Sequence, residues 1–142
     1  MNKQLRNDTA LPTHFMTDEQ QALADQAGKF FMSEFHHLNA EMDDTDDLPS
    51  SVFPKLGEMG YLGLNVPTEF GGAGLDFTSA CIITEEMSRA SAAIGLTHVA
   101  HDNLCVNNIY RNANDDLRRK YLPGLCNGTL IGALGLTEPG AG

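Results

Sequence analysis

The sequence lacks tryptophan, has only three cysteines, and contains no long apolar run among its 142 residues. No stretch approaches the roughly 20 consecutive apolar residues that a membrane-spanning helix needs. We therefore expect no membrane-embedded segment. The odd number and wide spacing of Cys81, Cys105 and Cys126 argue against a disulfide framework and predict reduced, mostly buried thiols.

Basic residues are also scarce, since 9 Lys and Arg stand against 19 Asp and Glu, and the formal net charge is -10. Such a surface disfavours binding to nucleic acids and to anionic membranes. The polar residues 1–16 lack the apolar core of a secretory signal, so we expect a loose N-terminal tail. A cytoplasmic location is the default expectation.

The remaining sequence predicts an all-α fold of about five helices, because apolar residues recur at helical spacing. The first helix is expected to begin at Thr17, where TDEQ is typical of a capping box. Its expected apolar face comprises Leu23, Ala27, Phe30, Phe31, Phe35 and Leu38. An acidic segment then follows, and its cluster at 43–47 lacks the Gly and closing Glu of a calcium loop. This segment predicts a solvated linker.

Four further helices are expected in the same domain, which we place at residues 17–128. A short helix capped by Ser51 should bury Val52, Leu56 and Met59 and end at Gly60. The third should run from about residue 76 or 77 to 93, and the fourth, apolar on more than one side, from about 96 to 111. The fifth should begin at Asn114, with the following residues facing inward: Leu117, Tyr121, Leu122 and Leu125.

Residues TLIGALGLT (129–137) predict a strand, the first in the chain. A single strand has no partner for its backbone hydrogen bonds. We therefore expect residues 129–142 to be the truncated start of a second, β-rich domain within a larger fold.

A cluster on the predicted fourth helix combines His98, His101, Asp102 and Cys105. Three of these side chains share roughly one face, but a zinc site would need a fourth ligand and supporting contacts. Core or interface histidines are the favoured interpretation, and no metal site is predicted. Glu85 and Glu86 are adjacent, point about 100° apart, and cannot act as a facing carboxylate pair.

The C-terminal stretch IGALGLTEPGAG carries one hydroxyl, one carboxylate and several small residues. Glycine and alanine let a ligand approach the backbone, whose exposed N–H groups can meet carbonyls or phosphates. The pattern suits a flat aromatic ligand. A tight turn at a sheet edge remains the alternative from chemistry alone.

LTEPGAG, preceded by KYLPGLCNGTLIGA, resembles the flavin-binding segment of the acyl-CoA dehydrogenase family. GYLGLNVPTEFGGAGLDF, ITEEMSRASAAIGL and HDNLCVNNIYRNANDDLRRKYLP resemble the same family in the same order. Together these segments cover about residue 17 to the end. The segments HDNLCVNNIYRN and IGALGLTEPGAG are most similar to the isovaleryl-CoA dehydrogenase branch.

The resemblance implies FAD as cofactor and an N-terminal helical domain followed by a β domain and a second helical domain. It implies flavin contacts from Leu134, Gly135, Leu136, Thr137, Glu138, Pro139, Gly140, Ala141 and Gly142. The Thr137 hydroxyl would bond the polar edge of the ring. Leu134 stands where many relatives carry an aromatic residue.

The resemblance also implies that Leu96, Ala100 and Leu104 floor the acyl pocket, where a bulky Leu96 would favour short or branched acyl chains. The family's catalytic glutamate lies in the later helical domain, beyond this chain. The implied reaction is α,β-dehydrogenation of an acyl-CoA, with an electron-transfer flavoprotein as acceptor and a homotetramer as assembly. In a eukaryote the location would be the mitochondrial matrix.

A second hypothesis is a stand-alone acidic helical interaction module without cofactor or catalysis. Fragments of domain size often expose apolar patches where a neighbour belongs. A colourless, monodisperse protein unaffected by added flavin would favour that alternative.

Overall fold

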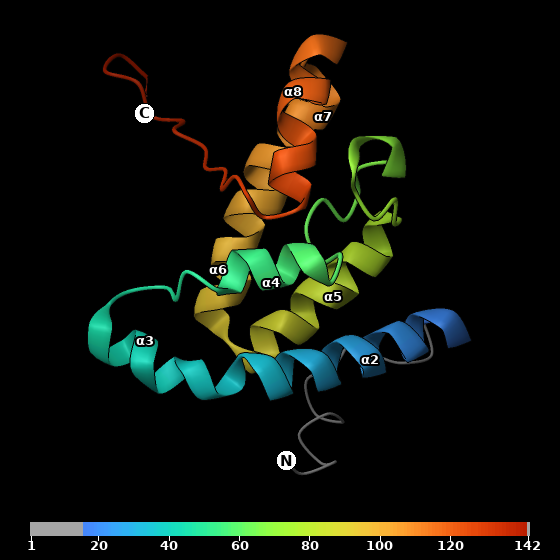
Figure 1. Cartoon of the computed structure of the whole chain (residues 1–142), viewed down its shortest axis with the longest axis vertical. Helices are drawn as coiled ribbons and strands as arrows, with labels where there is room; N and C mark the ends of the chain where they lie inside the picture. The colour runs from blue at the N-terminus through green and yellow to red at the C-terminus, as the bar shows by residue number, and fades with distance from the viewer. Residues whose placement is uncertain (1–15, 142) are drawn as a thin grey trace.

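The computed structural model describes residues 16–141, which form an all-α domain with an extended C-terminal segment (Figure 1). The α-helices are α2 (Asp18–Glu34), α3 (Asn39–Thr45), α4 (Val52–Glu58), α5 (Phe77–Ala90), α6 (Ala92–Val99), α7 (Asn107–Asn112) and α8 (Asp115–Cys126). Short 3-10 turns lie at His36–Leu38 and Thr68–Phe70, and a π-helical stretch, η4 (Ala100–Val106), joins α6 to α7. The all-α prediction is confirmed. No helix within residues 16–141 is both long and apolar enough to cross a bilayer.

The start of α2 is the capping box expected from TDEQ. The Gln20 N–H donates to Thr17 Oγ1 at 3.2 Å, and the Thr17 N–H donates to Gln20 Oε1 at 3.1 Å. Two donors at the helix start are thereby satisfied reciprocally. The predicted tail at residues 1–16 lies, apart from Met16, outside the described residues.

The larger core cluster lies where α2, α4 and α5 meet, and Figure 1 shows α2 crossing α5. Phe31 of α2 and Phe35 at its C-terminal cap are almost fully buried there, together with Leu56 of α4 and Met87 of α5. A smaller cluster is formed by Val66, Phe70, Val106, Leu122, Leu125 and Cys126. The helical apolar faces therefore meet as their spacing predicts.

The prediction of a solvated linker after the first helix was wrong in part, because residues 39–45 form α3. Met42 on α3 is buried in the larger core cluster, and this contact offsets the poor helix propensity of the acidic run. The helix ends at Asp46, whose φ of 51° lies in the left-handed region. A charge-based prediction could not detect one buried methionine among carboxylates.

Two details of α4 also differ from the prediction. Ser51 makes no side-chain cap hydrogen bond, because its own backbone is already helical. Met59 is 48% exposed, since it lies at the C-terminal cap of α4. Val52 and Leu56 are buried as expected.

The third predicted helix is shorter and the fourth longer than expected. Ser91 separates them by adopting an extended backbone and accepting the Ile94 N–H on Oγ at 3.3 Å. The third helix, α5, therefore ends at Ala90. The fourth begins at Ala92, and α6, η4 and α7 together form one rod from Ala92 to Asn112. The sequence did not indicate this break, because Ser91 stands among alanines within a segment whose apolar spacing is helical on both sides.

The fifth helix, α8, is capped by Asn114 as expected, with the Leu117 N–H donating to Asn114 Oδ1 at 3.0 Å. Leu122 and Leu125 are buried, but Leu117 and Tyr121 are 42% and 37% exposed. Their inward placement was wrong because α8 buries only the half that meets the smaller core cluster.

Residues 129–141, hereafter the C-terminal ribbon, leave the end of α8 and extend away from the helices (Figure 1). The predicted strand over 129–137 does not form, because the part of the chain that the structure describes offers it no neighbouring strand. The pairing in this ribbon is an isolated bridge between Glu138 and Ala141. The assignment of residues 129–142 to a second domain remains a prediction.

The cysteines are free, but only one of them is buried. Cys126 is buried, Cys105 is intermediate and Cys81 is exposed. The prediction of mostly buried thiols therefore holds for Cys126 alone, because Cys81 lines an open cleft between α5 and α6 and stays exposed.

Candidate functional site

The central rod formed by α6, η4 and α7 carries three buried polar side chains that bond to distant loops. His98 and His101 are 2% and 0% exposed, and Asp102 is 8% exposed. The interpretation of the two histidines as core residues is confirmed. Among residues 16–141, no group of three or more His, Cys, Asp or Glu side chains is arranged to hold a metal ion.

Asp102 organises the loop that follows α4. Its carboxylate accepts the Leu64 N–H at 3.2 Å and the Gly63 N–H at a shorter distance. Gly63 has a φ of 65°, a conformation that favours glycine. The residues GYLGLN are therefore held in a tight turn against the central rod. Nothing in the spacing of these residues predicted that contact, since they lie 38 and 39 positions from Asp102.

His101 joins the central rod to α8 and to the C-terminal ribbon. Its Nε2 lies 3.1 Å from the Leu125 carbonyl, and its Nδ1 lies 2.9 Å from the Gly132 nitrogen, whose N–H donates. The Phe53 ring packs edge-on against the imidazole at 5.0 Å. Burial lowers the pKa of His101 and opposes its charging.

The sequence-predicted flavin contacts lie on the exposed part of the ribbon. Leu134 and Leu136 are 43% and 78% exposed, and a Cβ added at Gly135 or Gly140 would meet no atom within 4 Å. The remaining predicted contacts there, Thr137, Glu138, Pro139 and Ala141, are also exposed. Gly142 lies outside the described residues.

The backbone of residues 134–137 makes no backbone hydrogen bond within residues 16–141. Its N–H and C=O groups are therefore open to hydrogen bonds from a ligand or from another part of a larger protein. Backbone groups of this kind need such partners if they become buried. The ribbon fits a planar, hydrogen-bonding group such as a flavin ring in this respect.

The predicted acyl-pocket residues lie on the outer side of the central rod. Leu96 and Leu104 are 72% and 43% exposed, and Ala100 between them is half-buried. They line neither the cleft between α5 and α6–η4 nor the groove beside α3, which are described below. The described residues thus place the three side chains on one rod but do not enclose a pocket around them.

A cleft of about 210 Å³ lies on another side of the same rod, between α5 and α6–η4. Its lining includes Phe77, Cys81 and His98. His98 Nε2 bonds the Tyr61 carbonyl at 2.8 Å, while its Nδ1 is buried without a partner. None of the predicted site residues lines this cleft.

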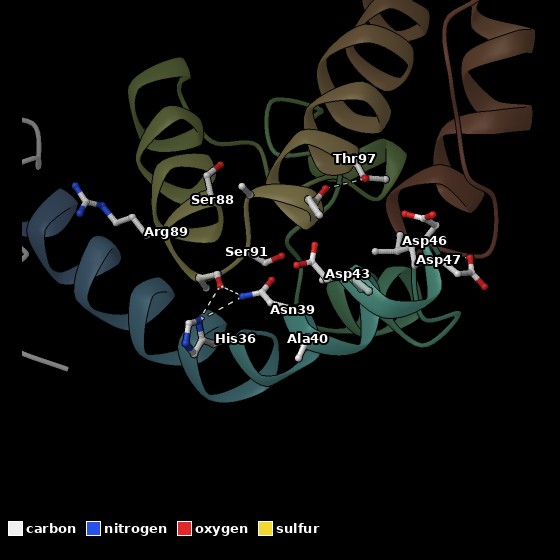
Figure 2. A pocket seen from close by; sticks show the side chains of 15 residues that line it. His36, Asn39, Ala40, Asp43, Asp46, Asp47, Ser88, Arg89, Ser91 and Thr97 are labelled. Carbon is white, nitrogen blue, oxygen red and sulfur yellow. Dashed lines mark hydrogen bonds between the residues drawn. The ribbon is translucent and has the colours of Figure 1, made fainter.

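A wider groove of about 770 Å³ lies between α3 and the junction of α5 with α6 (Figure 2). Asp43, Asp46 and Asp47 lie along one side of it. Just before and at the start of α3, His36 Nδ1 and Asn39 Nδ2 both bond the Ala90 carbonyl at the end of α5, at 3.1 and 2.9 Å. These polar groups complete the end of α5, so the groove is explained by helix capping and a solvated acidic edge.

The two carboxylates on α5 both form ion pairs with Arg89. Glu85 lies 2.6 Å and Glu86 lies 3.9 Å from Arg89. Each pair stabilises a helix surface by an i,i+3 or i,i+4 contact, and neither carboxylate lines either large cavity.

Comparison with known proteins matches residues 17–129 to the acyl-CoA dehydrogenase N-terminal domain. The chain is 39% identical over 129 residues to the mitochondrial isovaleryl-CoA dehydrogenase of Bos taurus, covering 89% of this chain and 30% of that protein. It is 38% identical over 144 residues to the corresponding Solanum tuberosum protein, covering 99% of this chain and 35% of that one.

Among solved structures, the acyl-CoA dehydrogenase of Bacillus anthracis in complex with FAD superposes with a TM-score of 0.82. The two are 32% identical, and the match covers 93% of this chain and 23% of that chain. The chain therefore spans about a third of the length of the curated relatives that it matches. The ordered motifs, the helical architecture and these matches agree: the chain belongs to the acyl-CoA dehydrogenase family and carries its N-terminal helical domain.

Proposed function

We propose that this chain supplies the N-terminal part of an FAD-dependent acyl-CoA dehydrogenase acting on a short or branched acyl-CoA such as isovaleryl-CoA. The observation that carries this proposal is the C-terminal ribbon. Its small residues are exposed, its backbone from 134 to 137 is unpaired within residues 16–141, and it begins at a fixed contact with the central rod.

Residues 134–137 would lie against the flavin ring, and residues 138–142 would turn toward its pyrophosphate. The Thr137 hydroxyl can donate to or accept from a polar edge, and the open space at Gly135 and Gly140 allows close approach. A bound flavin would accept the two electrons of the dehydrogenation. Leu134 offers aliphatic contact with the ring and no aromatic stacking.

The exposed stripe of Leu96, Ala100 and Leu104 would become one wall of the acyl pocket once the remaining domains cover it. A leucine at 96 narrows such a pocket, and overpacking excludes longer chains. The base that removes the α proton is not assigned to this chain: Glu85 and Glu86 pair with Arg89, and Glu138 lies on the exposed ribbon.

The whole protein would pass electrons to an electron-transfer flavoprotein and assemble as a homotetramer, as the family resemblance implies. Its location would be the cytoplasm of a bacterium or the mitochondrial matrix of a eukaryote. The mitochondrial names of the isovaleryl-CoA dehydrogenases of cattle and potato support the second of these.

The proposal is tested on the native-length protein that contains these residues, purified from its source. We expect a flavin absorbance spectrum and isovaleryl-CoA-dependent dye reduction faster than with octanoyl-CoA. L96A should raise kcat/KM for the longer substrate relative to the shorter one by about tenfold, as removal of a few methylenes from a pocket wall allows.

L117A is the matched control, because Leu117 is also an exposed leucine but lies on α8. It should leave the ratio unchanged. A purified protein without flavin that ignores added FAD and acyl-CoA would contradict the proposal and favour the interaction module.

A further inference from the structure

His101 has a bonding pattern that only one form of the imidazole satisfies. The Gly132 N–H can only donate, so Nδ1 must accept and carry no proton. The proton of the neutral ring therefore lies on Nε2, which donates to the Leu125 carbonyl. A second proton would place an N–H of the imidazolium against the N–H of Gly132.

The ribbon is packed against the central rod at the residue that makes this bond. A Cβ added at Gly132 would lie 2.4 Å from the Cys105 sulfur and 2.8 Å from its Cβ. Burial raises the pKa of the Cys105 thiol, and the backbone of the neighbouring Ala133 acts on the same thiol and partly offsets that rise. Ribbon and rod therefore meet at two consecutive residues, and from 134 to 137 the backbone has no further partner within residues 16–141.

Leu125 and Gly132 lie on opposite sides of the turn between α8 and the ribbon. By bonding both, one buried ring fixes how far and in which direction the ribbon leaves the helices. Binding is strengthened when a contact surface is held in its bound geometry beforehand.

We propose that neutral His101 is a positioning residue for the flavin-facing ribbon. Through Gly132 and Leu125 it holds residues 134–137 in the orientation that receives the ring. The flavin part of this inference rests on the proposed function. The imidazole touches neither flavin nor substrate in this role and is not a catalytic residue.

The first test is amide hydrogen exchange in the 142-residue chain and two variants. H101N keeps a side-chain oxygen near the Nδ1 position, whereas H101Q places its amide near the Nε2 position and leaves the Gly132 N–H without its acceptor. We expect exchange at Gly132 about tenfold faster in H101Q than in the wild type, as loss of one buried hydrogen bond implies. Exchange in H101N should stay nearer the wild-type rate.

Leu130 supplies the internal control, because its N–H donates to the Gly124 carbonyl at 2.9 Å and not to His101. Its exchange should change little in H101Q. H37N is a second control, since His37 is exposed in the 3-10 turn between α2 and α3. Equal Gly132 exchange in the wild type and a folded H101Q would overturn the inference.

A measurement on the wild type alone covers the case in which both variants unfold. Protonation of His101 would break the Gly132 hydrogen bond. Because burial lowers the pKa of His101 below its ordinary 6.5, protection at Gly132 relative to Leu130 should fall as the pH drops through that lowered pKa. The groups facing the ring are Asp102 and His98 on its own rod, the Leu125 carbonyl on α8, and the uncharged Phe53 on α4. A constant ratio down to the onset of unfolding would count against the role.

The second test separates this inference from the proposed function. In the native-length protein, H101Q should weaken FAD binding by about fivefold to tenfold, the effect of losing one positioning hydrogen bond, and H101N should weaken it less. If the wild type binds FAD and H101Q binds it with the same affinity, the positioning role is refuted and the proposed function stays intact. A wild type that binds no FAD would refute the proposed function and the flavin part of this inference together, while the exchange data would still decide whether His101 holds the ribbon.

Discussion

Asp102 of the central rod accepts the backbone N–H of Leu64 at 3.2 Å and thereby joins η4 to a loop 38 positions earlier in the chain. The same carboxylate also accepts the Gly63 N–H. One buried side chain thus satisfies two donors of a turn that has no secondary structure of its own. The position of this loop depends on a charge that composition alone would assign to the solvent.

We expect D102N to destabilise the chain by about 2 kcal/mol, because a side-chain amide replaces one acceptor oxygen with a donor and leaves a buried N–H unpaired. The measurement is the free energy of unfolding from urea denaturation. D44N is the control, since Asp44 is exposed on α3 and its change should stay within about 0.5 kcal/mol. Equal effects of the two substitutions would contradict a structural role for Asp102.

Substituting alanine at Gly72 and at Gly135 compares the effect of one added methyl group on stability at a crowded position and at an open one. A Cβ at Gly72 would lie 2.2 Å from the Val66 carbonyl oxygen and 2.6 Å from that of Gly63, whereas one at Gly135 would meet nothing within 4 Å. G72A should therefore destabilise the chain by roughly 1–3 kcal/mol through overpacking against backbone. G135A should change its stability by less than about 0.5 kcal/mol. Thermal denaturation of both variants decides this, and a tolerated G72A would show that the loop relaxes.

The pH dependence of stability should carry a contribution from His101. Burial lowers its pKa below the ordinary 6.5, so below that pH the unfolded chain binds more protons at this site than the folded chain does. The stabilising contribution is therefore present above about pH 6.5 and is lost as the pH falls through the lowered pKa of the folded state. Urea midpoints between pH 7.5 and pH 5 should fall less steeply in H101Q than in the wild type. Parallel curves would show that other groups govern the dependence.

The thiols should react in the order of their exposure. Cys81 is exposed, whereas burial raises the pKa of Cys105, and raises that of Cys126 to about 12. Because the thiolate is the reactive form, alkylation followed by mass spectrometry should modify Cys81 first, Cys105 more slowly, and Cys126 only on unfolding. Early modification of Cys126 would indicate that α8 separates readily from the Gly63–Gly72 loop.

Local chemistry in the sequence was sufficient to predict the α-helical segments other than α3, and several of their ends. Thr17, with Gln20 three positions later, specifies its cap from four consecutive residues, and Asn114 does the same for α8. The spacing of Phe31 and Phe35 placed the buried face of α2 correctly. The family motifs, each also contiguous, are sufficient to identify the domain.

Contacts between distant residues were decided only by the tertiary structure. Met42 turned an acidic linker into α3, and the packing of α8 through Leu122, Leu125 and Cys126 left Leu117 and Tyr121 exposed. Residues 129–137 stayed extended because no second strand lies beside them within residues 16–141. The bonds of Asp102 to Gly63 and of His101 to Gly132 join positions 39 and 31 residues apart. No local pattern encodes such a pair, because its energy exists only after the helices have packed and excluded water from both partners.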